Sequence, residues 1–364
     1  MSIESQVELD ETLFTLQRKW ERLTVAWLNV TLTAVEPLEL PPYKGSTFRG
    51  AFGWAFQRVC CLTGWPSCSG CVSRSVCAYA QVFEAMTVHG TIPPLRGLQD
   101  ISRPFVLRPP RDRQEKYQPG DRLQLELLLF GRAIPLTPLF IRAFLLLAAQ
   151  GVGRGRGRMR VERVEAWLPQ GDAVNLFDLD SGNGATRGQR PFYATLGQWL
   201  GNSRPVAVGT NGKCETVSIE FITMTRFKHD GRLVKFGPPF SVLVASLLRR
   251  LTTLWWYCGG EEEAERFAYI PEGEKGMEDE KASRWLYREL VERAAEVRLL
   301  DANTRWDDWV RFSYRQQQRM LLGGLTGRAV YDEEARLFLP LLKAGEIVHV
   351  GKGTTFGLGQ YRLS

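Results

Sequence analysis

The hydrophobic and polar positions predict strands and helices in a definite order in the first half of the chain. Alternating apolar and polar residues over Leu23–Val35, again over Leu123–Leu129 and again over Met159–Leu168 are typical of β-strands. Helical spacing of apolar residues follows Ser46, and a strongly apolar helix opens at Thr137. The first half therefore contains strands separated by two helices.

The second half repeats this order. Alternation around Ile219 predicts a strand, and an apolar helix follows the two prolines at 238–239. The further elements expected here are strands over Trp306–Tyr314 and Leu325–Tyr331, a short helix over Glu333–Leu342, and strand pieces over Glu346–Val350 and Leu358–Leu363. Each half thus reads strand–helix–strand–strand–helix–strand. This order predicts an α+β protein of two tandem ferredoxin-like (RRM-like) domains, each an antiparallel sheet with helices on one face.

These patterns also predict the domain boundaries. We expect an N-terminal domain over 1–168, a connection over 169–213 that is rich in turn residues, and a C-terminal domain over 214–364. The charged stretch 261–300 is expected to be a helical insertion in the second domain, and 351–359 a glycine-rich loop. The segment 61–77 is too rich in cysteine to form a regular element, and we expect it to be a small insert.

Charge and composition narrow the class of protein. The 364 residues carry 47 Lys and Arg against 40 Asp and Glu, a formal charge of +7 that favours polyanionic partners. The N-terminus lacks the basic and apolar regions of a signal peptide, and no apolar run reaches the roughly 20 residues that span a bilayer. We therefore expect a cytoplasmic protein that does not act at a membrane.

Five of the seven cysteines lie within Cys60–Cys77. Odd number and tight clustering argue against a secreted disulfide scaffold. The spacing of Cys61, Cys68, Cys71 and Cys77 suits a zinc knuckle, in which four thiolates leave no position for a catalytic water, so such a zinc would be structural. Cys60 competes with Cys61 as a ligand. Unliganded thiols or an iron–sulfur site are the alternatives.

Two glycine-rich segments could contact phosphate. Between Gly151 and Arg160 glycine alternates with arginine, whose planar guanidinium pairs well with phosphate. A solvated basic turn is the alternative reading. The loop Gly351–Gly359 matches neither a P-loop nor a dinucleotide fingerprint. Its backbone amides could still form an anion-binding nest beside Lys352, or it could be only a tight turn.

Only three histidines are available to move protons near neutral pH: His89, His229 and His349. His229 lies in a basic loop and His349 precedes the glycine-rich loop, whereas His89 has the weakest sequence context. Any one of them can equally be structural.

Four segments together resemble the CRISPR-associated endoribonucleases that process precursor CRISPR RNA, within the RAMP superfamily, and the four-cysteine insert resembles one branch of them. The segments span about 45–364. They are FRGAFGWAFQRVCCLTGWPSCSGC with CAYAQVFE and RPFVLRPP after it, YQPGDRLQLELLLFGRAIPLTPLFIRAFLLLAAQGVGRGR, ITMTRFKHDGRLVKFGPPFSVLVASLLRRL, and FSYRQQQRMLLGGLTGRAVY continuing to IVHVGKGTTFGLGQY. The resemblance implies binding of CRISPR repeat RNA and one metal-independent cut per repeat. In that family the ribose 2′-hydroxyl attacks the adjacent phosphate and leaves a 2′,3′-cyclic phosphate and a 5′-hydroxyl.

The first helix lacks the histidine that many members of this family carry there. We therefore predict His349 as the proton carrier, Lys352 or Lys44 as a charge stabiliser and Tyr43 as an auxiliary group. The residues predicted to bind RNA are Arg49, Arg154, Arg156, Arg158, Arg160, Lys228, His229, Arg232, Lys235, Gly351, Gly353, Gly357 and Gly359. The alternative is a RAMP subunit that binds CRISPR RNA in an effector complex without cutting it.

Overall fold

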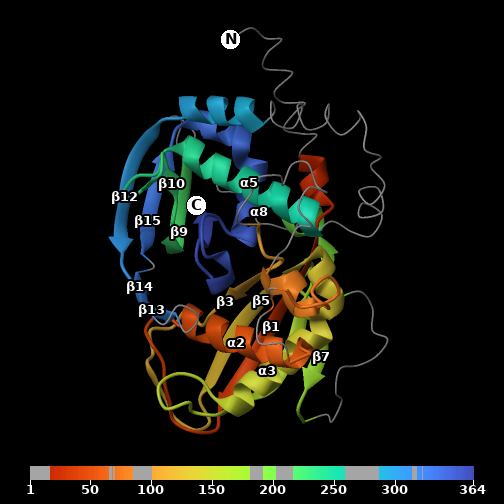
Figure 1. The fold of residues 1–364 in the computed structure, drawn as a ribbon. Coiled ribbons are helices and arrows are strands. Elements are labelled where there is room, and N and C mark those ends of the chain that lie inside the picture. The colour runs from red at the N-terminus through yellow and green to blue at the C-terminus, as the bar shows by residue number, and fades with distance from the viewer. Residues whose placement is uncertain are drawn as a thin grey trace, which may run out of the picture.

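The computed structural model describes residues 17–64, 68, 70–84, 101–180, 192–201, 216–258, 287–313, 318–321 and 323–364. Its first domain contains a six-stranded antiparallel sheet. Its strands are β1 (Thr24–Ala34), β3 (Phe105–Arg108), β5 (Arg122–Phe130), β6 (Met159–Trp167), β7 (Ala173–Asp178) and β8 (Ala194–Thr195). The order across the sheet is β3-β5-β1-β6-β7, and β8 also pairs with β1. Helices α2 (Gly45–Cys60) and α3 (Thr137–Gln150) connect the strands and lie side by side on one face of the sheet (Figure 1).

The second domain repeats this topology. Its sheet has the order β12-β15-β9-β16, formed by β9 (Val217–Thr225), β12 (Leu299–Asp307), β15 (Gly324–Tyr331) and β16 (Tyr361–Leu363). Helices α5 (Phe240–Cys258) and α8 (Leu339–Val348) pack against each other beside this sheet (Figure 1). In the first domain the first strand, β1, lies between the third, β5, and the fourth, β6. In the second domain β9 lies in the same way between β15 and β16. The predicted tandem ferredoxin-like fold is therefore confirmed.

The remaining elements are short. Strands β2 (Leu38–Glu39) and β4 (Lys116–Tyr117) pair with each other, as do β10 (Lys228–His229) with β11 (Arg232–Leu233) and β13 (Val310–Ser313) with β14 (Gln318–Leu321). The short helical elements are η1 (Ala80–Glu84), η3 (Gly131–Leu136), α4 (Leu196–Gly201), η4 (Glu333–Phe338) and η5 (Thr354–Phe356).

Two hydrophobic cores hold the fold together. One fills the space between the first sheet and its helices and is rich in rings such as Phe52, Phe56, Phe140 and Phe144. The other belongs to the second domain, but it also takes in Val106, Leu128 and Phe130 from the opposite face of the first sheet. Because the second core extends across the boundary, apolar burial fixes the two domains against each other.

Three sequence expectations need correction. Residues 346–348 are the last residues of α8, although Glu346–Val350 was predicted as a strand piece. Part of the predicted connection over 169–213 is sheet, because β7 pairs with β6 and β8 with β1. The predicted insertion 261–300 lies partly outside the described residues, and where it is described it forms a helix at 287–296 and the first residues of β12.

Among the described residues, one helical stretch, Gly131–Gln150, is long and apolar enough to cross a membrane by length and composition. Half of its most apolar window is buried inside the fold, where α3 packs against α2 and β6. A helix in the core of a globular domain can be equally long and apolar, and the burial of this stretch is typical of such a helix.

Candidate nucleic-acid interface at the domain junction

The glycine-rich loop of the second domain lies against the start of α2 in the first. The Tyr43 hydroxyl donates to the Phe356 carbonyl oxygen at 2.6 Å. A Cβ atom added to Gly45 would come within 2.2 Å of the same oxygen, and one added to Gly357 within 2.9 Å of the Leu107 carbonyl oxygen. The structure thus brings together two regions that the sequence analysis singled out about 310 residues apart.

Glycine is required in this loop because of the backbone. Gly351, Gly353, Gly357 and Gly359 all have φ between 75° and 80°, the left-handed region that other residues rarely adopt. A Cβ on Gly351 would lie 2.7 Å from the Arg226 carbonyl oxygen. The loop is therefore held close to neighbouring backbone, and substitution there is strained.

Tyr43 and Lys44 both make structural contacts. The Lys44 side chain is fully buried, donates to the Asp112 carbonyl oxygen at 2.7 Å and lies 3.1 Å from the Asp112 carboxylate. Burial raises the pKa of Tyr43 well above its ordinary value, so its hydroxyl stays protonated and remains a donor. The Lys44 ammonium group is thus buried and engaged by Asp112, which fits a structural role better than its predicted role as a charge stabiliser.

Arg108, which the sequence analysis missed, joins the two domains. It ends β3, is 5 % exposed, and donates from Nε to His349 Nε2 at 2.8 Å. Its terminal nitrogens donate to Glu126 Oε2 at 3.0 Å and to the Glu346 carbonyl oxygen at 2.9 Å. The guanidinium also stacks over the Trp27 ring, 4.6 Å from its centroid. One side chain from the first domain thus binds the end of α8 in the second.

His349 is fully buried, and this corrects its predicted role. A guanidinium can only donate, so His349 Nε2 must accept the Arg108 hydrogen bond and Nδ1 must carry the ring hydrogen toward the Leu358 carbonyl oxygen, 3.0 Å away. Burial, and then the charge of Arg108, hold the pKa of His349 well below its ordinary value. A neutral ring with both nitrogens engaged does not fit a proton carrier for RNA. It fits a role in holding the loop, as does the positive φ of 63° at this residue.

The buried neutral state of His349 predicts a pH effect on stability. The folded protein keeps this ring neutral, whereas the unfolded chain binds a proton below about pH 6.5, so stability should fall as the pH drops below that value. A His349→Gln variant should lose this contribution, which is at most about 1.4 kcal/mol per pH unit. Urea unfolding between pH 7 and pH 5 measures the slope. A His229→Gln control, at an exposed histidine, should keep it, and equal slopes in all three proteins would contradict the assignment.

The accessible cations at the junction are Lys352 and Arg111. Both side chains are exposed, and neither forms an ion pair with a described residue. The Lys352 amide donates to the Arg226 carbonyl oxygen at 3.2 Å, which anchors the loop beneath an exposed ammonium group. Arg111 lies close enough to Arg108 and His349 to lower the pKa of both. A phosphate at this junction would meet two unpaired positive charges.

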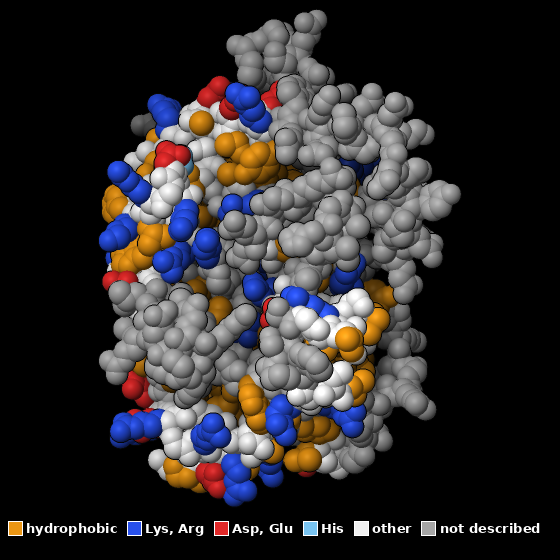
Figure 2. Space-filling model, in the orientation of Figure 1, with side chains coloured by type: hydrophobic (Ala, Val, Ile, Leu, Met, Phe, Trp, Pro, Cys, Tyr) orange, Lys and Arg blue, Asp and Glu red, His pale blue; other side chains and the backbone are white. Residues whose placement is uncertain are grey.

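A second basic surface surrounds β10 and β11. Lys228, His229, Arg232 and Lys235, all predicted to bind RNA, are exposed here. Figure 2 shows Lys and Arg side chains gathered over this part of the second domain. Phe236 beside them is 63 % exposed, and the Lys235 ammonium lies 5.8 Å from the centroid of the Trp306 ring. An exposed ring such as Phe236 beside cations suits the stacking of unpaired bases, a signal that the sequence analysis did not use.

The arginines of the glycine–arginine run are partly neutralised. Arg154 Nη1 lies 3.4 Å from Glu39 Oε1, and Arg158 Nη2 lies 2.6 Å from Glu36 Oε1. Arg156 and Arg160 are exposed. Such exposed ion pairs are weak, so phosphate can compete with them, but the run is a turn bound to the chain's own acids. The geometry of the run is thus compatible with contact to phosphate and with a solvated basic turn, and RNA binding by its arginines stays a prediction.

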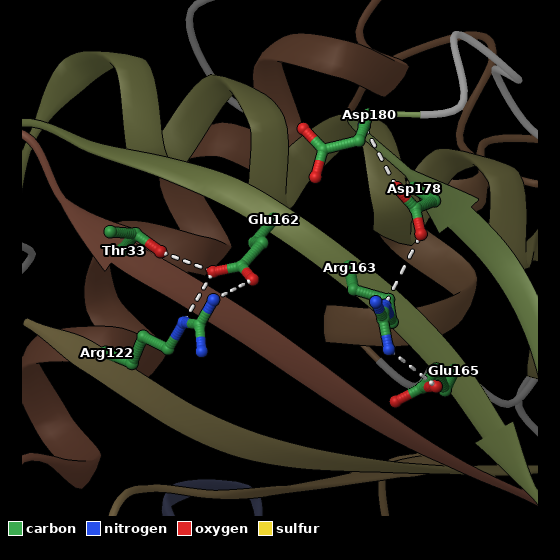
Figure 3. Close-up of polar contacts among 7 residues, drawn as sticks. All are labelled: Thr33, Arg122, Glu162, Arg163, Glu165, Asp178 and Asp180. Atoms are coloured by element: carbon green, nitrogen blue, oxygen red, sulfur yellow. Dashed lines mark hydrogen bonds and ion pairs between the residues drawn. The ribbon is translucent and has the colours of Figure 1, made fainter. Parts of the chain in front are cut away.

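The sheet face opposite α2 and α3 is less suited to RNA. Figure 3 shows Glu162 accepting from Thr33 at 2.8 Å and from both Nε and Nη2 of Arg122. Arg163 lies between Asp178 and Glu165, at 3.4 and 3.5 Å. These arginines are paired with acids (Figure 3). Farther along β1 and β6, Trp167 is 39 % exposed, and its ring centroid lies 6.1 Å from that of Trp27. The paired arginines therefore make this part of the sheet less suited to phosphate.

Arg49 is half-buried and does not reach outward. Its guanidinium lies 4.3 Å from the centroid of the Phe83 ring and 5.4 Å from those of Phe105 and Phe356. This enclosure between aromatic faces fits packing at the domain junction better than the predicted contact with RNA.

The described cysteines form no disulfide with one another. Gln57 donates to Cys68 Sγ at 3.7 Å, and Thr63 contacts Cys71 Sγ at 3.6 Å. Burial and the nearby Cys77 and Cys61 raise the pKa of Cys60 to about 12. Among the described residues no three His, Cys, Asp or Glu side chains are placed to hold a metal ion. The zinc knuckle of Cys61, Cys68, Cys71 and Cys77 stays a prediction.

Comparison with known families identifies the second domain. Residues 219–361, which include the glycine-rich loop and the basic hairpin, match the family model of the CRISPR-associated endoribonuclease Cas6. This stretch is a Cas6-family domain. Residues 23–188 match a second family model, described as an N-terminal domain. The resemblance to the CRISPR RNA-processing endoribonucleases is thereby confirmed, whereas the assignment to the branch with a four-cysteine insert stays a prediction.

Proteins similar to this chain align with nearly its whole length. An uncharacterized protein of Archaeoglobus fulgidus is 26% identical over 330 residues, 89% of this chain and 92% of that protein. A chain of a partial Cas6-RT-Cas1–Cas2 complex aligns with a TM-score of 0.50 at 14% identity, over 94% of this chain and 46% of that one. Thermus thermophilus Cas6 aligns with a TM-score of 0.45 at 18% identity, over 94% and 99% of the two chains. At these identities the alignments concern the fold alone.

Proposed function

We propose that this chain is an endoribonuclease that binds CRISPR repeat RNA and cuts precursor CRISPR RNA once within each repeat. The observation that carries the proposal is the Cas6-family domain, whose glycine-rich loop is seated at the domain junction beside the exposed cations Lys352 and Arg111. The basic hairpin and Phe236 supply a second surface for the same RNA. We expect the same surfaces to bind the RNA when this chain is part of a CRISPR effector complex.

The proposed chemistry is attack by the ribose 2′-hydroxyl on the adjacent phosphate, without a metal ion. The products are a 2′,3′-cyclic phosphate and a 5′-hydroxyl. Because the nucleophile is already part of the substrate, the protein must hold it in line with the leaving oxygen, stabilise charge on the phosphate and move protons. We assign the stabilisation of charge to the exposed ammonium group of Lys352. His229, exposed on the basic hairpin, is the accessible histidine among the described residues.

Cleavage of the cognate repeat RNA in EDTA tests the proposal, with a copy carrying a 2′-deoxyribose at the cut site as control. We expect the RNA to be cut and the deoxy copy to remain intact. Cleavage that stops in EDTA would overturn metal independence, and cleavage of the deoxy copy would overturn the 2′-hydroxyl mechanism. In the same assay Lys352→Ala should slow cleavage about a hundredfold, as loss of a transition-state charge contact does, whereas Lys343→Ala, on α8, should not.

The alternative is a RAMP subunit that binds CRISPR RNA without cutting it. The burial of His349 and Lys44 favours it, because two of the predicted catalytic groups are out of reach. Tight binding of the repeat RNA with no cut in either copy would select this alternative. A His229→Ala variant that cleaves at the full rate would show that His229 does not move protons in the reaction.

A further inference from the structure

The outward face of α3 is apolar where a surface helix normally carries polar residues. Before the exposed Gln150 that ends the helix, the exposed or half-buried positions are Pro138, Leu139, Arg142, Leu145, Leu146 and Ala149. Only Arg142 among these is polar, and Leu145 is 37 % exposed. Because α3 is apolar on this face as well as on its buried face, the stretch that contains it is apolar enough to cross a membrane, although half of it is buried in a core.

The apolar surface continues onto α2. Trp54 is 43 % exposed, and the Arg58 guanidinium lies 5.4 Å from the centroid of its ring. Val59 lines an open depression of about 490 Å³ together with Arg142, Leu145 and Leu146. We call Trp54, Arg58, Val59, Arg142, Leu145 and Leu146 the α2–α3 face. Contiguous exposed apolar surface rimmed by polar groups is typical of a docking site.

The charge of this face has one sign. Neither α2 nor α3 contains an aspartate or glutamate. Arg58 and Arg142 are exposed and form no ion pair with any residue that the structure describes. Figure 2 shows hydrophobic and cationic side chains intermixed in the lower half of the view, where Figure 1 places the two helices. A partner that complements this face is apolar at its centre and acidic at its edges.

We propose that the α2–α3 face docks an amphipathic helix of a partner protein. Its apolar stripe would fill the depression, and acidic side chains flanking the stripe would pair with Arg58 and Arg142. RNA fits less well, because the depression is lined by aliphatic side chains with few cations and offers no row of phosphate contacts. A second copy fits less well too, because a two-fold interface would bring the same arginines together.

The test measures fluorescence anisotropy of a labelled synthetic helix with Leu at i, i+3, i+4 and i+7 and Glu at the flanking positions. A matched peptide carries Lys instead of Glu. The full-length protein should bind the Glu peptide at least about tenfold more tightly. The double variant Arg58→Glu/Arg142→Glu should reverse this preference. An Arg160→Glu control, at an exposed cation of β6, should leave the preference unchanged.

Leu145→Asp should abolish binding of both peptides while cleavage of repeat RNA stays at the wild-type rate. Cleavage is thus the control for folding, and peptide binding does not depend on the proposed activity. The proposal would be overturned if the wild-type protein bound both peptides equally or bound neither. It would also be overturned if the double arginine variant bound RNA more weakly than the wild type, because the face would then be an RNA-binding surface. A dimer that is seen in sedimentation and that Leu145→Asp dissociates would show instead that the face binds a second copy of the chain.

Discussion

Replacing Arg108 with alanine is expected to lower the free energy of unfolding by about 3 kcal/mol. The substitution leaves the Glu126 carboxylate without its guanidinium and removes the hydrogen bonds to His349 Nε2 and the Glu346 carbonyl oxygen. It also removes the stacking on Trp27. Breaking a buried ion pair costs about 3–5 kcal/mol, and the lower end applies because the Glu126 side chain is 26 % exposed and keeps some water.

Urea unfolding followed by circular dichroism measures this loss. The matched control is Arg122→Ala on β5, whose partner Glu162 lies at 2.6 Å but whose own side chain is 68 % exposed, so its loss should stay below about 1 kcal/mol. Arg108→Lys should not restore stability, because a lysine cannot make these contacts together. A change of less than about 1 kcal/mol in Arg108→Ala would show that Arg108 does not join the domains.

Periodicity was enough to predict the fold, because alternation and helical spacing are properties of short segments. The order strand–helix–strand–strand–helix–strand was visible in both halves, and both sheets have the corresponding topology. The failures have physical causes. The β-branched pair Ile347 and Val348 favours a strand, but both residues are buried on α8, where packing decides. The strand β7 has a half-buried, weak pattern and forms only by pairing with β6.

The site could be predicted only in part. The resemblance pointed to Tyr43 and Lys44 and to the glycine-rich loop, and the structure places them together at the junction. Arg108 lies in the segment RPFVLRPP that carries part of the resemblance, but its role was missed, because it is one arginine at the end of an apolar strand and its partner His349 lies 241 residues away. A lone histidine beside a glycine loop looks the same in sequence whether it is exposed or buried. Only the tertiary contacts show that His349 organises the loop.

Replacing Gly45 with alanine is expected to slow cleavage of repeat RNA about a hundredfold, because it moves the glycine-rich loop. Gly45 is the first residue of α2, and its added Cβ would lie 2.2 Å from the Phe356 carbonyl oxygen and 2.6 Å from the Tyr43 ring. Both contacts are far too short, so loop and helix must separate and the Tyr43 hydrogen bond must lengthen. A displacement of about 1 Å at a catalytic geometry can cost a hundredfold in rate.

The chain offers a matched control in the same helix. Gly50 is exposed and has nothing within 4 Å of an added Cβ, so Gly50→Ala should cleave at the wild-type rate and gain up to about 1 kcal/mol of stability from helix propensity. Tyr43→Phe removes the hydrogen bond but leaves the space open, and should slow cleavage less than Gly45→Ala. Circular dichroism confirms that each variant folds. A folded Gly45→Ala protein that cleaves at the full rate would show that the seating of the loop against α2 is not needed for cleavage, and the reaction centre would then have to lie elsewhere on the RNA-binding surface.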